Sequence, residues 1–257
     1  MVNQASEITR DFASPVAQNE VVWFCVARVL RPICSLRSHC DPMKLDHRYI
    51  VVEGPIGVGK SSLTNIVAQR FEARRVMEVV EENPFLASFY DDRAKYAFQT
   101  QMFFLLSRFK QQQELFQQDL FKQFTVSDYL FAKDRIFASI TLDPNELGLY
   151  ERIYQHLGPQ VKKPDLVVYL QARQEVLLGR IKKRGREFER KFDPDYLAEL
   201  SRTYNDFFHR YEESPLLIVN TSEVDYSENE ADLDDLIKQM GQVKAGQHYF
   251  QPMANRK

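Results

Sequence analysis

The sequence predicts an α/β protein in which a parallel sheet of five strands is flanked by helices. Two observations support this prediction: short apolar runs alternate with helical segments, and the first run leads into a glycine-rich stretch from Gly54 to Ser61. The 257 residues have enough apolar content for one such domain. The formal net charge of −2 provides no strong field that would favour nucleic acid or an anionic membrane as a partner.

Five short apolar runs are predicted as strands because they have the length and residue types of buried strands. They are Tyr49–Glu53, Val76–Val80, Phe124–Ser127, Leu166–Leu170 and Leu216–Asn220. Segments with apolar residues at helical spacing are predicted as helices, namely Ser61–Phe71, Lys95–Phe121, Glu175–Lys183 and Tyr196–Tyr211. This alternation predicts a sheet that is covered on both faces.

Residues 1–42 differ in composition from the rest of the chain. They contain every cysteine and the single tryptophan, namely Cys25, Cys34, Cys40 and Trp23. The apolar run Val21–Leu30 is shorter than the roughly 20 residues of a membrane span and includes Arg28. We therefore expect an N-terminal appendage at 1–42 and a folded domain at 43–257. The appendage has three interpretations: an over-long gene start, a targeting segment or a flexible tail. A cytoplasmic location is expected, with mitochondrial targeting by residues 1–42 as the alternative.

The stretch from Gly54 to Ser61 fits the phosphate-binding pattern G-x-x-x-x-G-K-[ST]. Its glycines let successive backbone N–H groups point at phosphate oxygens, and the next helix adds a favourable dipole. Lys60 is expected to reach the terminal phosphates, and the Ser61 hydroxyl to bind Mg²⁺. The expected nucleotide contacts in this region are Gly54, Gly57, Val58, Gly59, Lys60, Ser61 and Ser62.

Features downstream of the loop favour a small-molecule kinase over a GTPase or a motor ATPase. The chain has no N-K-x-D motif, and its third predicted strand ends in FTVSDY rather than in D-E. Asp128 is the expected carboxylate on the Mg²⁺ side, with a helix cap as the alternative. A kinase also needs a carboxylate near the acceptor hydroxyl. Glu78 on the second predicted strand supplies it, with Glu81 and Glu82 close behind.

The basic stretch Gly179–Lys191 predicts a lid that neutralises the transferring phosphoryl group and excludes water. Arg180 is the expected nucleotide contact in this lid, and Arg184 and Arg186 are the expected catalytic cations. A solvated basic helix end or a nucleic-acid patch would have a similar composition, and both remain alternatives at this point.

From Tyr49 to about Met240 the chain resembles the deoxynucleoside kinases. The resemblance rests on MEVVEENPFLASFYDD from Met77, QMFFLLSR from Gln101 and RGREFERKFDPDYL from Arg184. It implies the P-loop kinase fold with an arginine-rich lid, ATP as phosphate donor, and Glu78 as base toward the 5′-hydroxyl. The further substrate contacts that it implies are Tyr90, Gln101, Arg108, Asp128 and Glu189.

The acceptor region also fits a nucleoside on physical grounds, because a flat base favours aromatic stacking and a bidentate amide. Gln101 lies among apolar neighbours, where an amide without a partner is costly, and this favours a role in base recognition. The aromatic residues expected near it are Phe85, Phe89, Phe103 and Phe104.

The chain departs from the family pattern after the third predicted strand, where SDYLFAKDR has Tyr129 at the position of an expected arginine. Lys133, Arg135 or Arg108 could supply the missing charge. The NPFL block and the SDYLF form resemble the bacterial purine-type members. The resemblance therefore favours deoxyguanosine or deoxyadenosine as the acceptor.

Together, these features predict an ATP- and Mg²⁺-dependent kinase that phosphorylates the 5′-hydroxyl of a deoxynucleoside in nucleotide salvage. No nucleic-acid or membrane partner is expected, and the resemblance implies a homodimer formed through Lys95–Phe121 and its neighbour. The alternatives are a nucleoside monophosphate kinase of the thymidylate kinase type and a non-catalytic nucleotide-binding regulator.

Overall fold

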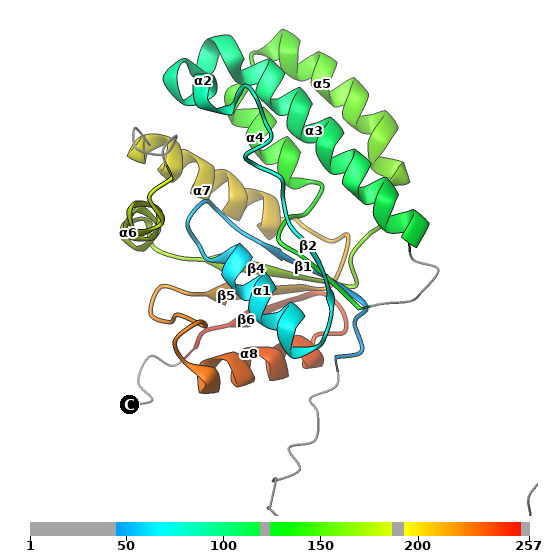
Figure 1. The fold of residues 1–257 in the computed structure, drawn as a ribbon, viewed down its shortest axis with the longest axis vertical. Helices are drawn as coiled ribbons and strands as arrows, with labels where there is room; N and C mark the ends of the chain where they lie inside the picture. Colours follow the sequence, from blue (N-terminus) through cyan, green and yellow to red (C-terminus); the bar gives the residue numbers. More distant parts are fainter. Residues whose placement is uncertain (1–44, 119–123, 187–192, 253–257) are drawn as a thin grey trace, which may run out of the picture. The chain divides into compact units, whose positions relative to one another are not determined.

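The computed structural model describes residues 45–118, 124–186 and 193–252. Its centre is a parallel sheet with strand order β2-β3-β1-β4-β5-β6 (Figure 1). The strands are β1 (Tyr49–Glu53), β2 (Arg74–Val76), β3 (Thr125–Ser127), β4 (Leu166–Gln171), β5 (Leu216–Asn220) and β6 (Gln247–Phe250). The predicted appendage at 1–42 and the predicted substrate contact Glu189 lie outside the described residues.

The sheet has six strands, so the prediction of five is wrong. Strand β6 pairs with β5 at the edge of the sheet, and its sequence Gln-His-Tyr-Phe lacks the apolar run of a buried strand. The bounds of the second strand are also corrected. β2 ends at Val76, which pairs with Ser127, so Glu78 lies just beyond the strand rather than on it.

The four predicted helices are present with shifted bounds, and several further helices complete the fold. In chain order they are α1 (Lys60–Arg70), α2 (Leu86–Asp91), α3 (Arg93–Gln118), α4 (Lys133–Thr141), α5 (Pro144–Leu157), the short 3₁₀ helix η2 (Gly158–Gln160), α6 (Gln174–Arg184), α7 (Pro194–His209) and α8 (Glu230–Gln242). No helix in the described ranges is long and apolar enough to span a membrane.

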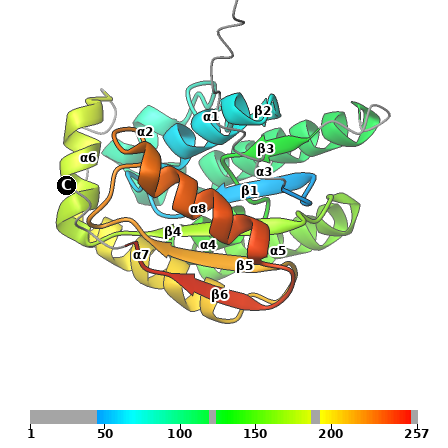
Figure 2. The same cartoon turned by 90° about the horizontal axis from the view of Figure 1, so that it is seen from below.

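Both faces of the sheet are buried because successive side chains of a strand point to opposite sides. On one face, Ile50 and Val168 pack with side chains of α1, α6 and α8. On the other face, Val51 and Tyr169 pack with side chains of α4 and α7. Figures 1 and 2 show α8 and α7 on opposite sides of the sheet. The near-continuous apolar sequence of these strands follows from this double burial.

The carboxyl ends of the parallel strands meet at one edge of the sheet. β1 leads into the glycine-rich loop, β2 leads toward Glu78, and β3 leads into Asp128. In open α/β sheets, ligands bind in the crevice at this edge. The topology therefore brings together side chains that lie far apart in the sequence.

Candidate active site

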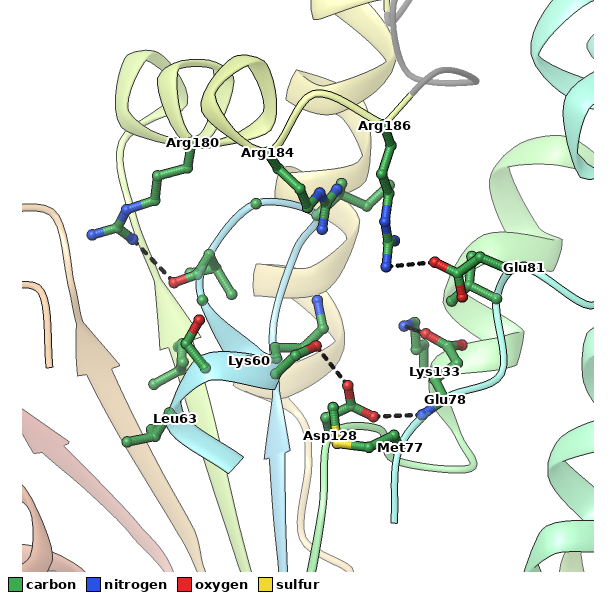
Figure 3. A pocket seen from close by; sticks show the side chains of 18 of the residues that line it. Lys60, Leu63, Met77, Glu78, Glu81, Asp128, Lys133, Arg180, Arg184 and Arg186 are labelled. Carbon is green, nitrogen blue, oxygen red and sulfur yellow. Dashed lines mark hydrogen bonds and ion pairs between the residues drawn. The ribbon is translucent and has the colours of Figure 1, made fainter. Parts of the chain in front are cut away.

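A cavity of about 680 Å³ lies at the carboxyl edge of the sheet (Figure 3). The predicted site residues among its lining are Gly57, Val58, Gly59, Lys60, Ser61, Ser62, Glu78, Tyr90, Gln101, Arg108, Asp128, Arg180, Arg184 and Arg186. Gly54 lies at the start of the loop, where its carbonyl oxygen accepts a hydrogen bond from Lys60. The phosphate-binding loop, the acidic residues, the aromatic helices and the basic segment therefore converge on one space.

Gly54 and Gly57 in the glycine-rich loop combine a positive φ, which other residues rarely adopt, with no space for a Cβ atom. Gly54 and Gly57 have φ values of 151° and 84°. A Cβ atom would lie 2.4 Å from the Leu170 carbonyl oxygen at Gly54 and 2.8 Å from the Leu177 carbonyl oxygen at Gly57. These contacts explain the glycines and fix the loop against β4 and α6.

Lys60 begins α1, and its Nζ donates hydrogen bonds to the carbonyl oxygens of Gly54 at 2.8 Å and Pro55 at 3.0 Å. The helix N-cap is Gly59, which provides no side-chain cap for the first N–H groups of the helix. Such N–H groups favour an anion. Burial, and next the charge of Lys133, lower the pKa of Lys60 to about 8.

Ser61 and Asp128 join the start of α1 to the end of β3. The Ser61 hydroxyl donates a hydrogen bond to Asp128 Oδ2 at 2.7 Å, and the Glu78 backbone N–H donates to Asp128 Oδ1 at 2.7 Å. Hydroxyl and carboxylate oxygens are the ligand types that Mg²⁺ prefers. The described residues include no cluster of three or more His, Cys, Asp or Glu side chains that could hold a metal. A cation at Ser61 and Asp128 would thus need further oxygens from a bound phosphate or water.

Glu78 is a largely buried carboxylate, its side chain 11% exposed, between two cations. Its Oε2 accepts a hydrogen bond from Lys133 Nζ at 2.7 Å, and its Oε1 accepts from Arg108 Nε at 3.0 Å. Burial alone would raise the pKa of Glu78, but Lys133 and Arg108 hold it well below its usual range. The carboxylate is therefore ionised. The other sequence candidates differ in position: Glu81 forms an ion pair with Arg186 at 2.8 Å, and Glu82 is exposed.

Two of the three candidates for the charge missing at Tyr129 contact Glu78. Tyr129 is fully buried, whereas Lys133 and Arg108 both contact Glu78. Arg135 instead forms an ion pair with Glu151 at 3.0 Å. Arg108 also forms a buried ion pair with Asp134, a residue that the sequence analysis did not single out.

The far end of the cavity has aromatic walls around an amide. Gln101 is 2% exposed, and its Oε1 has no hydrogen-bond partner among the described residues. Phe89 and Phe104 line the cavity as expected, but Phe85 and Phe103 are not part of the lining. The lining also contains three aromatic residues that were missed from the sequence, namely Phe137, Tyr196 and Tyr226. Phe137 lies on α4, a helix that was itself missed.

The basic segment contributes two kinds of contact. Arg180 donates hydrogen bonds to the carbonyl oxygens of Val58, Thr221 and Val224, each at 3.0 Å, and so ties α6 to the loop and to the segment after β5. Arg184 and Arg186 lie over the cavity opposite Lys60 and Glu78 in Figure 3.

Glu53, at the end of β1, is a buried carboxylate that the sequence analysis missed because it belongs to an apolar run. It accepts hydrogen bonds from the backbone N–H groups of Gly54 at 2.8 Å and Leu130 at 2.7 Å, and from the Tyr204 hydroxyl at 3.1 Å. Burial raises the pKa of Glu53. The residue connects the phosphate-binding loop to the segment that follows Asp128.

Comparison with known proteins matches residues 50–244 to the family model described as deoxynucleoside kinase. The chain belongs to the deoxynucleoside kinase family. Deoxyguanosine kinase from Bacillus subtilis is 37% identical over 191 residues, which cover 72% of this chain and 92% of that protein. Deoxyadenosine kinase from Lactobacillus acidophilus is 33% identical over 205 residues, which cover 74% of this chain and 94% of that protein.

Solved structures confirm the predicted fold class. The structure of deoxyadenosine kinase from M. mycoides with bound dATP has a TM-score of 0.65 and 27% identity, and the match covers 74% of this chain and 99% of that chain. The same enzyme with bound dCTP gives a TM-score of 0.62 and 26% identity, and the match covers 73% of this chain and 98% of that chain.

As a deoxynucleoside kinase, the protein is an enzyme that phosphorylates deoxynucleosides, and its family implies ATP as the phosphate donor. The two alternatives, a thymidylate-type monophosphate kinase and a non-catalytic regulator, are not favoured by these matches.

Proposed function

We propose that this deoxynucleoside kinase transfers the γ-phosphoryl group of ATP, with Mg²⁺, to the 5′-hydroxyl of deoxyguanosine or deoxyadenosine, making the monophosphate for salvage. The central supporting observation is the single cavity that holds the phosphate-binding loop, the largely buried Glu78 and the buried amide of Gln101. The purine preference is supported by relatives named deoxyguanosine kinase and deoxyadenosine kinase.

Glu78 is the proposed base. Its carboxylate lines the cavity and is ionised, so a hydroxyl that binds beside it can donate its proton to it. Lys60, Arg184 and Arg186 are the proposed cations that stabilise charge on the transferring group. Because they approach from the loop below and the lid above, they would also exclude water.

Ser61 and Asp128 are the residues that would hold Mg²⁺. Their hydroxyl and carboxylate oxygens lie 2.7 Å apart and suit a hard cation. When bound, the ion would neutralise phosphate charge and orient the triphosphate. Asp128 also fixes the backbone of Glu78, so it would position the base as well.

Gln101, Tyr90 and Arg108 are the proposed acceptor contacts. The Gln101 amide can form two hydrogen bonds with a base edge, and Phe89 and Phe104 provide apolar surface beside it. Arg108 would act mainly through Glu78, since its guanidinium pairs with that carboxylate and with Asp134. Glu189, outside the described residues, keeps its expected role at the 3′-hydroxyl as part of the proposal.

The experiment that tests this function measures phosphate transfer from ATP to four deoxynucleosides, thymidylate and shikimate. The highest kcat/KM is expected for deoxyguanosine or deoxyadenosine, with ADP and the 5′-monophosphate as products. A preference for thymidylate would indicate a monophosphate kinase instead. ATP binding without transfer to any nucleoside would indicate a regulator.

We also infer a homodimer that forms through α3 and α5. These two helices pack together, and they carry two of the large apolar side chains that are most exposed, Leu106 and Leu149, each 51% exposed. Light scattering of the purified protein tests this inference. A dimer that Leu106→Glu converts to a monomer supports it, and a wild-type monomer at micromolar concentration contradicts it.

Residues 1–42 are proposed as an appendage to a catalytic domain at 43–257 in a cytoplasmic enzyme. Support for this boundary comes from the family match, which begins at residue 50. A chain that starts at Met43 should keep the kcat and thermal stability of the full chain. A large loss of either would assign a structural role to residues 1–42.

A further inference from the structure

Lys133 occupies a buried position next to the proposed base. It is the first residue of α4 and is 5% exposed. Within the part of the chain that the structure describes, its ammonium group donates one hydrogen bond, to Glu78 Oε2 at 2.7 Å, and lies 5.6 Å from the centroid of the Phe137 ring. A lysine is almost never buried without a charged partner. Its ammonium can donate three hydrogen bonds, so it has capacity for a ligand in the cavity that it lines.

The other cations around the cavity have different positions or partners. The guanidinium of Arg108 is occupied by Glu78 and by the fully buried Asp134. Arg180 is tied to backbone carbonyl oxygens on the loop side. The lid arginines approach from the opposite side of the cavity, as Figure 3 shows. Lys183 also lines the cavity, on the same helix as Arg180 and Arg184. Lys133 is instead on α4, beside Glu78, and its described contacts leave N–H groups for a ligand.

Lys60 and Lys133 are close enough for their charges to act on each other across the cavity. Two ammonium groups that line one cavity, one of them buried and the other partly buried, repel each other, and an anion between them would be attracted to both. Lys60 belongs to the loop that binds phosphate, whereas Lys133 contacts the carboxylate proposed to take the acceptor proton. The space between them lies where a phosphoryl group would pass from donor to acceptor.

We propose that Lys133 is a catalytic cation of the transfer step, which binds an oxygen of the transferring phosphoryl group on the side opposite Lys60. This inference rests on the proposed function. In that step the bond between the γ-phosphorus and the β,γ-bridging oxygen breaks, and its electron pair leaves with ADP. A bond forms between the γ-phosphorus and the 5′-oxygen, whose proton goes to Glu78. Lys133 donates one of its remaining N–H groups to the phosphoryl oxygen, retains its hydrogen bond to Glu78 and keeps its proton throughout.

Two neutral variants separate this role from a purely structural one. Lys133→Met removes the charge and every hydrogen bond of the ammonium. Lys133→Gln removes the charge but keeps a side-chain donor for Glu78. Arg135→Met is the matched control, because Arg135 lies two residues along the same helix, is half exposed and pairs with Glu151 away from the cavity lining.

The measurements are kcat with the preferred deoxynucleoside, and the Kd values for ADP and for ADP with aluminium fluoride in the presence of that deoxynucleoside. The fluoride complex mimics the phosphoryl group in transfer. Both Lys133 variants should lower kcat on the order of 10²-fold, as for loss of one preorganised donor. Both variants should raise the Kd of the fluoride complex much more than the Kd of ADP alone. Arg135→Met should change each value less than about twofold.

An equal rise in the Kd of ADP and in the Kd of the fluoride complex would overturn the inference and leave Lys133 as a support for Glu78. Full activity of Lys133→Gln would have the same meaning. An active wild-type enzyme with a fully active Lys133→Met variant would overturn the inference alone. A wild-type protein that is inactive on every deoxynucleoside would overturn the proposed function together with this inference.

Discussion

The two ends of the cavity are assembled in different ways. The phosphate end comes from one continuous stretch, β1, the glycine-rich loop and α1, whose backbone geometry follows directly from Gly54 and Gly57. The acceptor end comes from distant segments: Glu78 is 30 residues from Arg108 and 55 residues from Lys133. A local motif can thus specify a phosphate site, but the choice of acceptor depends on contacts that form only when the chain folds.

The largest expected effect lies at the phosphate end. Lys60→Met removes the cation of the loop and should lower kcat by about 10³-fold or more, because the proposed role of this charge is to stabilise the transition state. Steady-state kinetics with saturating deoxynucleoside measure the loss. Arg70→Met is the control on the same helix, since Arg70 pairs with Asp234 away from the cavity lining. Comparable losses in both variants would refute a specific role for Lys60.

The next effect lies where the two ends meet. Glu78→Gln should lower kcat by about 10²-fold or more with a modest change in KM, because the amide cannot accept the acceptor proton. Glu82→Gln is the matched control, because Glu82 is exposed beside the same block. If Glu82→Gln were the inactive variant, the base would have to be reassigned.

A smaller and more selective effect is expected at the acceptor end. Gln101→Ala should lower kcat/KM for the deoxynucleoside by about 10- to 100-fold and leave the KM for ATP nearly unchanged, because a base-reading amide is lost. Gln113→Ala on the same helix is the control, since Gln113 donates to the Gln160 carbonyl oxygen instead. A parallel rise in the KM for ATP would contradict the separation of the two ends.

The smallest effect on catalysis is expected at Glu53, which connects the two ends. Its replacement should mainly lower the stability of the fold. Glu53→Gln puts an amide NH₂ where backbone N–H groups and a hydroxyl donate to a carboxylate. Loss of the hydrogen bonds to one carboxylate oxygen should lower the free energy of unfolding by about 1–3 kcal/mol. Urea denaturation measures this loss, with the exposed Glu114→Gln as control. Equal stabilities of the two variants would show that the buried carboxylate is not needed.

The sequence predicts the phosphate end well for a physical reason. Strand β1 has the predicted bounds, and the glycines of the loop pattern allow the positive φ angles that shape the loop. The fold class followed from the same alternation of apolar runs and helical segments. Strand β6 was missed because an edge strand is only partly buried and needs no apolar run.

The acceptor end was predicted less completely. Gln101 could be singled out because an amide among apolar residues needs a partner, and the structure places it in the cavity. Lys133 was one of three candidates for the charge missing at Tyr129. The sequence around Tyr129 does not reveal which of these cations lies next to Glu78 in the folded chain. Asp134 and Phe137 were missed with the helix that carries them. Their roles depend on how α3 and α4 pack, which no short pattern encodes.

The most direct test of the central claim, that the two ends form one transfer site, is the stoichiometry of products with a purine deoxynucleoside. The protein is incubated with ATP and deoxyguanosine or deoxyadenosine, and ADP and the nucleotide product are quantified by mass spectrometry and ³¹P NMR. Equimolar ADP and 5′-monophosphate are expected. ATP hydrolysis without nucleotide product, or phosphate at the 3′-position, would contradict it.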